Sequence, residues 1–196
     1  MAQPSNPNTS RYSKPSVLLH WAIALGIGFN LWWGLQFDGL EAAKAPDLRS
    51  IIDLHKSVGI TLLGLVLMRV LWRASHRPPQ PLPGLQRWER LLSTAVHHLL
   101  YLLMFLVPLL GWLHDSAWSA AASHPLVLFH ELPFFRLPLF NHMAAATRDH
   151  WHALLGEAHG LLAYTLLGAL ALHVLGALKH QFIDGKPELQ RMWFGR

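Results

Sequence analysis

The sequence predicts an all-α fold, an integral membrane four-helix bundle, and composition and spacing both support this prediction. Of the 196 residues, 52% are hydrophobic and only 14% are charged, too little polar surface for a soluble domain of this size. The apolar residues form four stretches, at about 16–37, 51–74, 91–113 and 153–178. Each stretch is long enough to cross a bilayer core of about 30 Å as a helix.

The segments around these stretches are polar or interrupted by proline. Residues 1–10 are rich in Pro, Asn and Ser and predict a disordered tail, so residues 11–196 form the single predicted domain. A polar connection occupies 38–50, and the proline-rich linker from Arg77 to Gly84 cannot be helical. The third connection, 114–152, is apolar but broken by prolines. A loop of this length is usually functional or lies on the membrane surface.

The basic residues predict the orientation of the helices. Eleven Lys and Arg residues lie on the side of the N-terminal tail, the second connection and the C-terminal tail, counting Arg69 and Arg73 at the end of the second stretch, and five lie on the opposite side. By the positive-inside rule, both termini are therefore cytoplasmic. Because the basic residues flank apolar stretches, the net charge of +5 indicates contact with a membrane surface, and no nucleic-acid partner is predicted.

The fourth stretch carries two histidines, His159 and His173, fourteen residues apart. In an α-helix this spacing is a rise of about 21 Å and falls about 40° short of four full turns. The two imidazoles therefore share one helix face but lie near opposite edges of the hydrocarbon. A ligand held at both depths needs two separate groups, and two stacked b-type haems fit that geometry. The chain has no Cys, which excludes covalently attached haem c and Fe–S clusters.

The predicted topology gives the other histidines a depth as well. His55 lies one turn inside the outer edge of the second stretch, at the depth of His159, and His20 lies one turn inside the inner edge of the first, at the depth of His173. A b-type haem held by side chains alone needs an axial ligand on each face, and facing helices of a bundle supply both. The pattern predicts one haem iron between His55 and His159 and a second between His20 and His173.

Other histidines leave alternatives open. His97 and His98 also lie near the inner edge, and either could replace His20 as a ligand. A hydrogen bond from His97 to a haem propionate or a quinone is the preferred interpretation. The remaining histidines of the third connection suggest a metal site but have no convincing ligand spacing: His114, His124, His130, His142, His150 and His152.

At these residues the chain resembles the prokaryotic cytochrome b561 family, four-helix, two-haem inner-membrane proteins that include superoxide oxidase. The resemblance covers nearly the whole chain, and its pieces are Arg11-Tyr-Ser…His20-Trp, Leu-His55-Lys-Ser-Val-Gly, His97…Tyr101…Pro108-Leu-Leu-Gly and the ladder His159…His173…His180. It implies the same two pairs of axial ligands and a multi-pass protein of the bacterial inner membrane. It also implies electron transfer from a periplasmic donor to ubiquinone.

Within this resemblance, superoxide is the expected donor, which would make the protein a superoxide:ubiquinone oxidoreductase. Anionic superoxide is steered by positive charge, and Lys56 and Arg148 are the candidate residues for this role. His97 and His180 are candidate contacts for a cofactor near the inner haem. Two alternatives remain. One is a cytochrome b subunit of a larger respiratory complex, with its partner on the long outer loop. The other is a haem-free transporter or scaffold that uses histidines for protons or metal.

Overall fold

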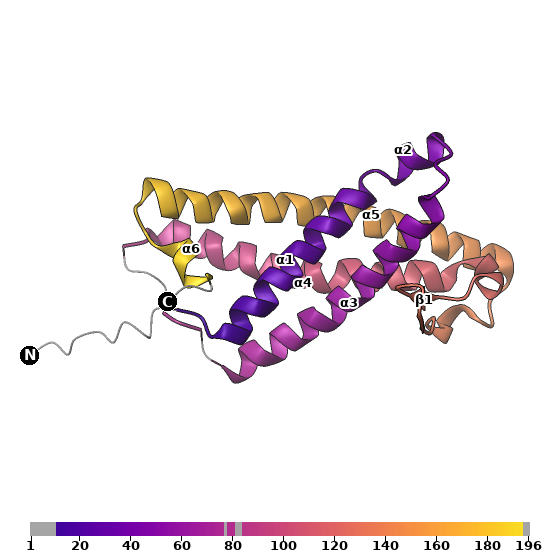
Figure 1. The fold of residues 1–196 in the computed structure, drawn as a ribbon, viewed down its shortest axis with the longest axis horizontal. Coiled ribbons are helices and arrows are strands. Elements are labelled where there is room, and N and C mark those ends of the chain that lie inside the picture. The colour runs from indigo at the N-terminus through magenta and orange to yellow at the C-terminus, as the bar shows by residue number, and fades with distance from the viewer. Residues whose placement is uncertain (1–10, 77, 81–83, 194–196) are drawn as a thin grey trace, which may run out of the picture.

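The computed structural model describes residues 11–76, 78–80 and 84–193. Four long helices dominate it: α1 (Lys14–Gly34), α3 (Leu48–Ser75), α4 (Arg87–Ala117) and α5 (Ala145–Leu178) (Figure 1). The predicted all-α fold with four spans is therefore confirmed. The tail predicted at 1–10 and part of the proline-rich linker lie outside the described residues.

The helix ends differ from the ends of the apolar stretches. α4 begins at Arg87 because Gln86 and Glu89 form a capping box, in which the Gln86 backbone N–H donates to Glu89 Oε2 at 2.9 Å. α5 begins at Ala145, eight residues before the predicted start at 153. These polar turns are helical although they are not hydrophobic, so the third connection is shorter than predicted.

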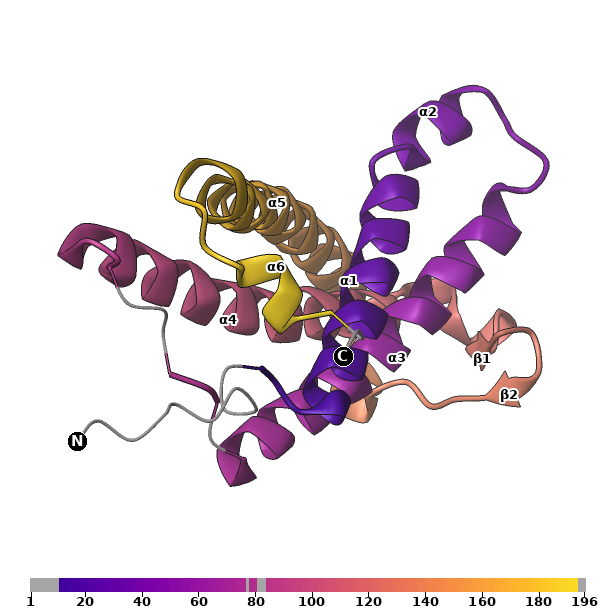
Figure 2. The same ribbon diagram turned by 60° about the vertical axis from the view of Figure 1, so that its left-hand side comes forward.

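The long helices form two pairs, α1 with α3 and α4 with α5, which cross at an angle (Figure 2). α1 approaches α3 closely at Gly26, where a Cβ would lie 2.8 Å from the Leu62 side chain. α3 also packs on α4. α5 packs closely on α4 and, within the described helices, has no comparable contact with α1 or α3. Side chains or a bound group must therefore fill the interface between α5 and the α1–α3 pair.

The surface of the bundle is apolar. Leu25, Leu71 and Leu161 are 71%, 69% and 68% exposed. The four helical segments are long and apolar enough to cross a membrane, and lipid covers such side chains at no hydrophobic cost. The chain is therefore a multi-pass membrane protein.

A buried apolar core lies at the middle of the bundle. It includes Ile27 of α1, Val66 of α3, Leu103 of α4 and Leu166 of α5. Leu166 is midway along the chain between His159 and His173. The core therefore separates the two levels at which those histidines lie.

Short elements connect the long helices at the outer end. The first connection contains α2 (Phe37–Ala42). The third connection contains η2 (Ser119–Ser123), the antiparallel strands β1 (Val127–Leu128) and β2 (Leu132–Pro133), and η3 (Pro138–Phe140).

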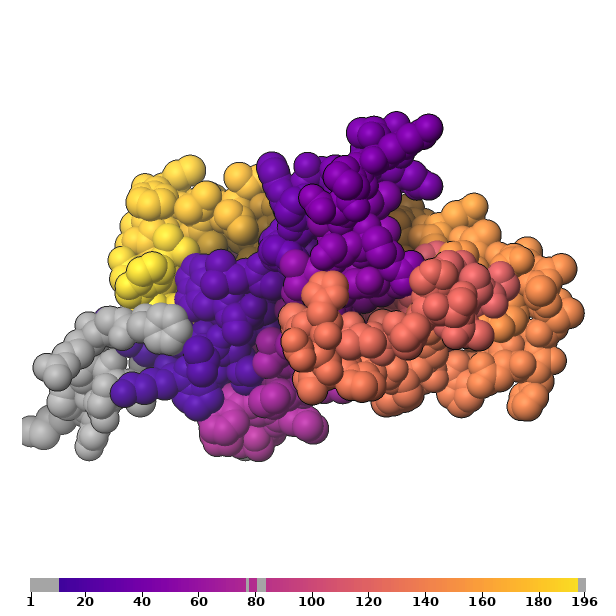
Figure 3. Space-filling model, turned by 45° about the vertical axis from the view of Figure 1, so that its right-hand side comes forward, coloured from indigo at the N-terminus to yellow at the C-terminus, as the bar shows by residue number. Residues whose placement is uncertain are grey.

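We call residues 118–144 the outer cap. Two hydroxyl groups hold it onto the bundle: the Phe129 N–H donates to Ser57 Oγ at 2.9 Å, and the Leu137 N–H donates to Ser116 Oγ at 3.0 Å. In Figure 3 this segment, coloured salmon to orange, lies on the lower right of the visible face, below the purple α2. The third connection is thus a folded cover over the ends of α3 and α4.

The C-terminal segment closes the other end. After α5, the π-helical turn η4 (Lys179–Ile183) and the short helix α6 (Glu188–Arg191) turn back onto the start of α1. Trp21 Nε1 donates to the Met192 carbonyl at 2.7 Å, and the Tyr12 N–H donates to the Arg191 carbonyl at 3.3 Å. Both ends of the described chain therefore lie at one end of the bundle (Figure 1).

The orientation of the bundle remains a prediction from the eleven-to-five split of Lys and Arg. A β-galactosidase-type reporter fused after Gln80 should be active in the cytoplasm, and an alkaline-phosphatase-type reporter fused after Ser123 should be active in the periplasm. The reciprocal fusions serve as controls and should be inactive. The opposite pattern would place the outer cap in the cytoplasm and reverse the proposed direction of electron transfer.

Candidate functional site

The structure brings together the two histidine pairs that the depth argument predicts. At the outer level, the ring centroids of His55 on α3 and His159 on α5 are 6.1 Å apart, with an interplanar angle of 82°. At the inner level, the centroids of His20 on α1 and His173 on α5 are 6.2 Å apart, with an angle of 70°. Within each pair, the two rings face each other across the interface between α5 and the α1–α3 pair.

These separations suit two imidazoles on opposite sides of one metal ion. A metal–nitrogen bond to histidine is about 2 Å long and the ring centre lies about 1 Å beyond the nitrogen, so the two centroids should be roughly 6 Å apart. Both observed values agree with this figure. Each pair therefore fits the axial ligation of one haem iron.

One ring of the outer pair, His159, has the hydrogen-bond support expected of a metal ligand, whereas His55 Nδ1 is buried without a hydrogen-bond partner in the described chain. His159 Nδ1 donates to the Val107 carbonyl at 2.9 Å, which fixes the ring and leaves Nε2 available. Gly111 lies against the same ring, where a Cβ would be 3.1 Å from His159 Cε1, and a Cβ at Gly34 would be 3.4 Å from His55 Cε1. Side chains at these glycines would press on the imidazoles.

A cavity of about 330 Å³ adjoins both outer histidines. Its walls come from all four long helices and are mostly apolar, which suits the faces of a macrocycle. Asn30 also lines it. Asn30 Nδ2 donates to the His55 carbonyl at 3.1 Å, and Asn30 Oδ1 is buried and has no hydrogen-bond partner in the described chain. An unpaired buried acceptor at a cavity wall is consistent with a bound group.

The inner level contains a third ring. His97 on α4 lies 5.1 Å from His173, centroid to centroid, and its Nδ1 is 2.6 Å from the Ser93 carbonyl of its own helix. Its centroid separation from His173 is shorter than that of the two pairs. The geometry therefore favours His20 as the partner of His173, with His97 beside the pair.

Arg69 on α3 belongs to the inner level. From the sequence it was used only as one of the basic residues that predict the orientation of the helices. Its Nη2 lies 3.5 Å from His20 Nδ1. Its other donors reach the Ser16 carbonyl at 3.0 Å and the Tyr101 hydroxyl at 3.1 Å. A signal for it was present, because a cation inside an apolar span is a functional candidate by default.

Four basic residues of the outer side gather around the end of α4, and we call them the outer basic cluster: Arg49, Lys56, Arg136 and Arg148. Lys56 Nζ and Arg136 Nε each lie 2.7 Å from the buried carboxylate of Asp115. Arg148 donates to the Trp118 carbonyl, and Arg49 Cζ lies 5.6 Å from the centroid of the Trp118 ring. The two residues predicted to steer a donor, Lys56 and Arg148, thus belong to one group of cations.

Three of the histidines assigned to the third connection lie on helices, which corrects that prediction. His114 is on α4, and His150 and His152 are on α5, because both helices extend past the apolar stretches. The rings of His114 and His152 stack at 3.8 Å, and each Nδ1 bonds the backbone carbonyl of the other residue, at 2.7 and 2.9 Å. This reciprocal pair joins α4 to α5 at the outer end.

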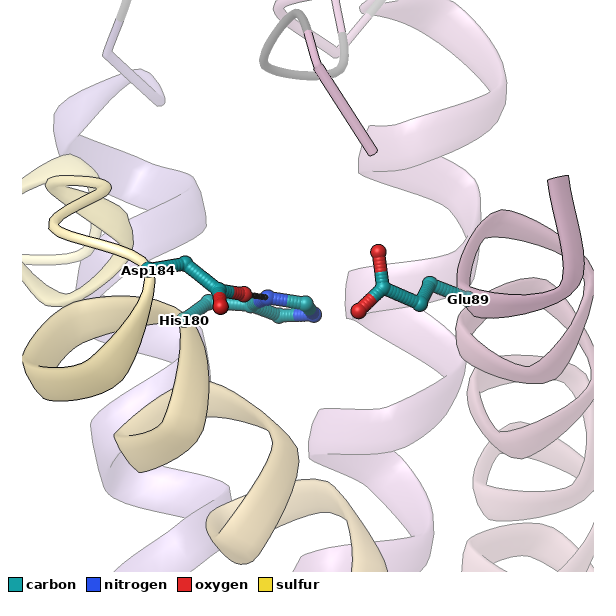
Figure 4. Close-up of side chains that lie close together, drawn as sticks. All are labelled: Glu89, His180 and Asp184. Atoms are coloured by element: carbon teal, nitrogen blue, oxygen red, sulfur yellow. Dashed lines mark hydrogen bonds and ion pairs between the residues drawn. The ribbon is translucent and has the colours of Figure 1, made fainter. Parts of the chain in front are cut away.

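His180 belongs to a polar cluster at the inner end, with Glu89, Lys179 and Asp184. Figure 4 shows Glu89, His180 and Asp184 of this cluster. Lys179 forms ion pairs with Glu89 and, at 2.9 Å, with Asp184, and His180 Nδ1 lies 2.6 Å from Asp184 Oδ2. Hydrogen bonds from Lys179, which has the larger effect, and from His180 lower the pKa of Asp184.

The carboxyl groups of Glu89 and Asp184 and the His180 ring have a spacing that suits a metal ion. However, the Lys179 ammonium already lies between the carboxylates, so the cluster is an ion-paired clasp between α4 and η4. The cofactor contact predicted for His180 remains a prediction.

The chain is similar to several known proteins. Residues 11–195 match the family described as Prokaryotic cytochrome b561. The chain is 35% identical over 188 residues to cytochrome b561 homolog 2 of Escherichia coli K12, covering 93% of this chain and 90% of that protein. It is 25% identical over 186 residues to the Yersinia pestis protein named probable superoxide oxidase CybB, covering 93% and 95% of the two chains. The family match includes all four long helices and both histidine pairs.

Proposed function

The chain belongs to the prokaryotic cytochrome b561 family, membrane proteins of electron transfer with b-type haem, and we propose that it carries electrons across the bacterial inner membrane from superoxide in the periplasm to ubiquinone. His55 and His159 would hold an outer haem, and His20 and His173 an inner one. The observation that carries this proposal is the pair of facing imidazoles at each level, 6.1 and 6.2 Å apart.

The protein's part in this function is positional and electrostatic. Bound b-type haems supply reversible one-electron chemistry, and the protein selects the axial ligands, the spacing and the local polarity. α5 provides one ligand at each level, and the rise between them is about 21 Å along one rigid helix. The apolar core around Leu166 excludes water between the two levels.

The charge distribution supports a small anionic donor at the outer face. The four side chains of the outer basic cluster are accompanied by two carboxylates, Asp53 and Asp115, which leaves a local surplus of two positive charges (4 − 2). The outer connections as a whole contain more acids than bases. The local excess of cations is therefore where steering of superoxide would act.

The inner level supports a quinone as the acceptor. His97 is exposed beside His173. Because His97 Nδ1 donates to the Ser93 carbonyl of its own helix, Nε2 of the neutral ring is an acceptor, suited to the hydroxyl of a quinol, the reduced form of the acceptor. We therefore assign His97 to the acceptor side, at the cytoplasmic end of the electron path.

The outer cap favours a second candidate, a cytochrome subunit whose partner docks at the periplasmic face. The cap presents several large apolar side chains: Phe129, Leu132, Phe135 and Leu139 are 44%, 62%, 60% and 63% exposed. Large apolar side chains exposed on one short segment are typical of a protein or membrane contact. A protein donor, instead of superoxide, would then reduce the outer level.

Reduction by superoxide tests the proposal against this alternative. We expect superoxide to reduce the purified protein rapidly and ubiquinone to reoxidise it, both followed by haem absorbance. Arg148→Glu should slow the first step by roughly threefold to tenfold at low ionic strength, because a cation near the entry site is replaced by an anion. High salt should reduce the difference, because screening weakens charge steering. Reoxidation by ubiquinone should not change.

Lys44→Glu is the matched control, because it makes the same charge change at an exposed residue of the first connection. It should slow reduction less than Arg148→Glu does. Two outcomes would contradict the proposal: equal effects of the two variants, or reduction by superoxide no faster than that of an unrelated b-type cytochrome. The donor would then not be superoxide, and the cytochrome subunit with a protein donor would be the better supported function.

A further inference from the structure

One ligand at each level has a group within hydrogen-bond distance of its Nδ1, and these two groups differ in kind; His55 Nδ1, at the outer level, is buried without a hydrogen-bond partner in the described chain. At the outer level, His159 Nδ1 donates to the Val107 carbonyl at 2.9 Å. A carbonyl acceptor increases the electron density of the imidazole, which makes it a stronger ligand for an oxidised metal. At the inner level, His20 Nδ1 faces the Arg69 guanidinium at 3.5 Å. An iron-ligating His20 carries its proton on Nδ1, and a guanidinium, which has only donors, cannot accept a hydrogen bond from it. His20 therefore lacks the electron-donating support that His159 has, and a positive charge lies beside its ring instead.

The charge of Arg69 has no carboxylate to balance it. Its hydrogen bonds go to two neutral oxygens, the Ser16 carbonyl and the Tyr101 hydroxyl, and no acidic side chain of the described chain lies within ion-pair distance of it. A second cation, Arg73, lies 6.0 Å from the centroid of the Tyr101 ring. At the outer level, Lys56, which adjoins the ligand His55 in the chain, is paired with Asp115 at 2.7 Å. The other cations of the outer basic cluster lie farther from the ligands. Arg49 and Arg148 are about 9 and 16 Å along their helices from His55 and His159, and Arg136 is in the outer cap.

An unbalanced positive charge favours the more reduced state of a nearby redox group, because reduction lowers the positive charge of that group. The effect is larger in a medium of low dielectric constant. Arg69 is only partly exposed and lies within the membrane-spanning segment of α3. Both its charge and its contact with His20 therefore act in the same direction at the inner level.

We propose that Arg69 is a positioning residue that raises the reduction potential of the inner haem site above that of the outer site. The inference rests on the proposed function, since it requires a haem at each level. One electron leaves the outer site and one arrives at the inner site, with no proton or further reactant. Arg69 thus gives the electron path its inward direction in this chain.

The test is an optically monitored redox titration of the full-length protein and its variants. Arg69→Gln removes the charge but retains a donor for the Ser16 carbonyl. It should shift the distribution of an electron between the two haem sites at least tenfold toward the outer site. This change corresponds to about 59 mV in the potential of a one-electron couple. The potential of the outer site should not move.

Two control variants separate charge from structure. Arg69→Lys retains the charge and should retain most of the difference in potential, whereas Tyr101→Phe removes the hydroxyl contact and should leave the difference nearly unchanged. A variant of an outer ligand, His159→Ala, identifies which transition belongs to the inner site.

The outcomes distinguish the inference from the function on which it rests. Two transitions in reversed order, or an Arg69→Gln variant that shifts both transitions equally or neither, overturn the inference alone. A single transition in an unsubstituted protein that holds two haems per chain also overturns the inference alone, whereas one haem per chain or none overturns the proposed function and the inference with it.

Discussion

Replacing His159 by alanine should remove one haem from the purified protein and leave the other. The expected haem content falls from about two to about one per chain, because the outer iron would lose one of its two axial ligands. His55→Ala should give the same result, since its ring faces His159 at a centroid separation of 6.1 Å. His20→Ala and His173→Ala should instead remove the inner haem. Extracted haem, measured per chain, and the low-spin b-type spectrum provide the readout.

Two histidines serve as matched controls. His97→Ala changes a ring that is 5.1 Å from His173, and His114→Ala changes a ring near the outer level that bonds the His152 carbonyl. Both variants should retain two haems. If His97→Ala loses the inner haem and His20→Ala keeps it, then His97 is the partner of His173 and the assignment of His20 is wrong. A colourless wild-type protein would favour the haem-free transporter or scaffold.

Much of the architecture follows from composition and helical rise. The four apolar stretches predict four helices, because a bilayer core selects for length and apolar character. Depth within each helix follows from chain position alone, so the proximity of His20 to His173 and of His55 to His159 is predictable without coordinates. The ends of the helices are less predictable. The turn at 145–152 of α5 contains Arg148, Asp149 and His150 and has no hydrophobic signal, yet it is helical.

The contacts around the sites depend on properties that depth does not define. Whether Arg69 meets His20 depends on how far α3 is rotated about its axis and on the reach of a long side chain. Likewise, the position of the outer cap depends on hydroxyl groups of Ser57 and Ser116 that accept backbone N–H bonds from distant residues. Neither feature has a periodic pattern in the sequence. The spacing therefore predicts which level a residue occupies, and the structure shows which group it meets there.

Replacing Asp115 by asparagine should destabilise the outer end of the protein strongly. Its carboxylate is 5% exposed and binds Lys56 Nζ and Arg136 Nε, each at 2.7 Å, while Arg136 also donates to the Ala121 carbonyl of the outer cap at 3.0 Å. Removing the negative charge leaves Arg136 without a counter-ion among the described residues and Lys56 with only the more distant carboxylate of Asp53, at 3.7 Å. Breaking a buried ion pair from one side typically costs about 3–5 kcal/mol in the free energy of unfolding.

The matched control is Asp53→Asn, the same substitution at a second partner of Lys56. The Asp53 side chain is 28% exposed, and its carboxylate lies 3.2 Å from Arg49 and 3.7 Å from Lys56. Exposed pairs of this kind contribute about 0–1 kcal/mol, so this variant should unfold almost as the wild type does. The measurements are thermal unfolding in detergent and the rate of protease cleavage within 118–144. Asp115→Asn should lower the midpoint and accelerate cleavage, because Arg136 links the carboxylate directly to the cap. Equal stability of the two variants would show that Asp115 does not hold the outer cap in place, and the hydroxyl contacts of Ser57 and Ser116 would then be sufficient.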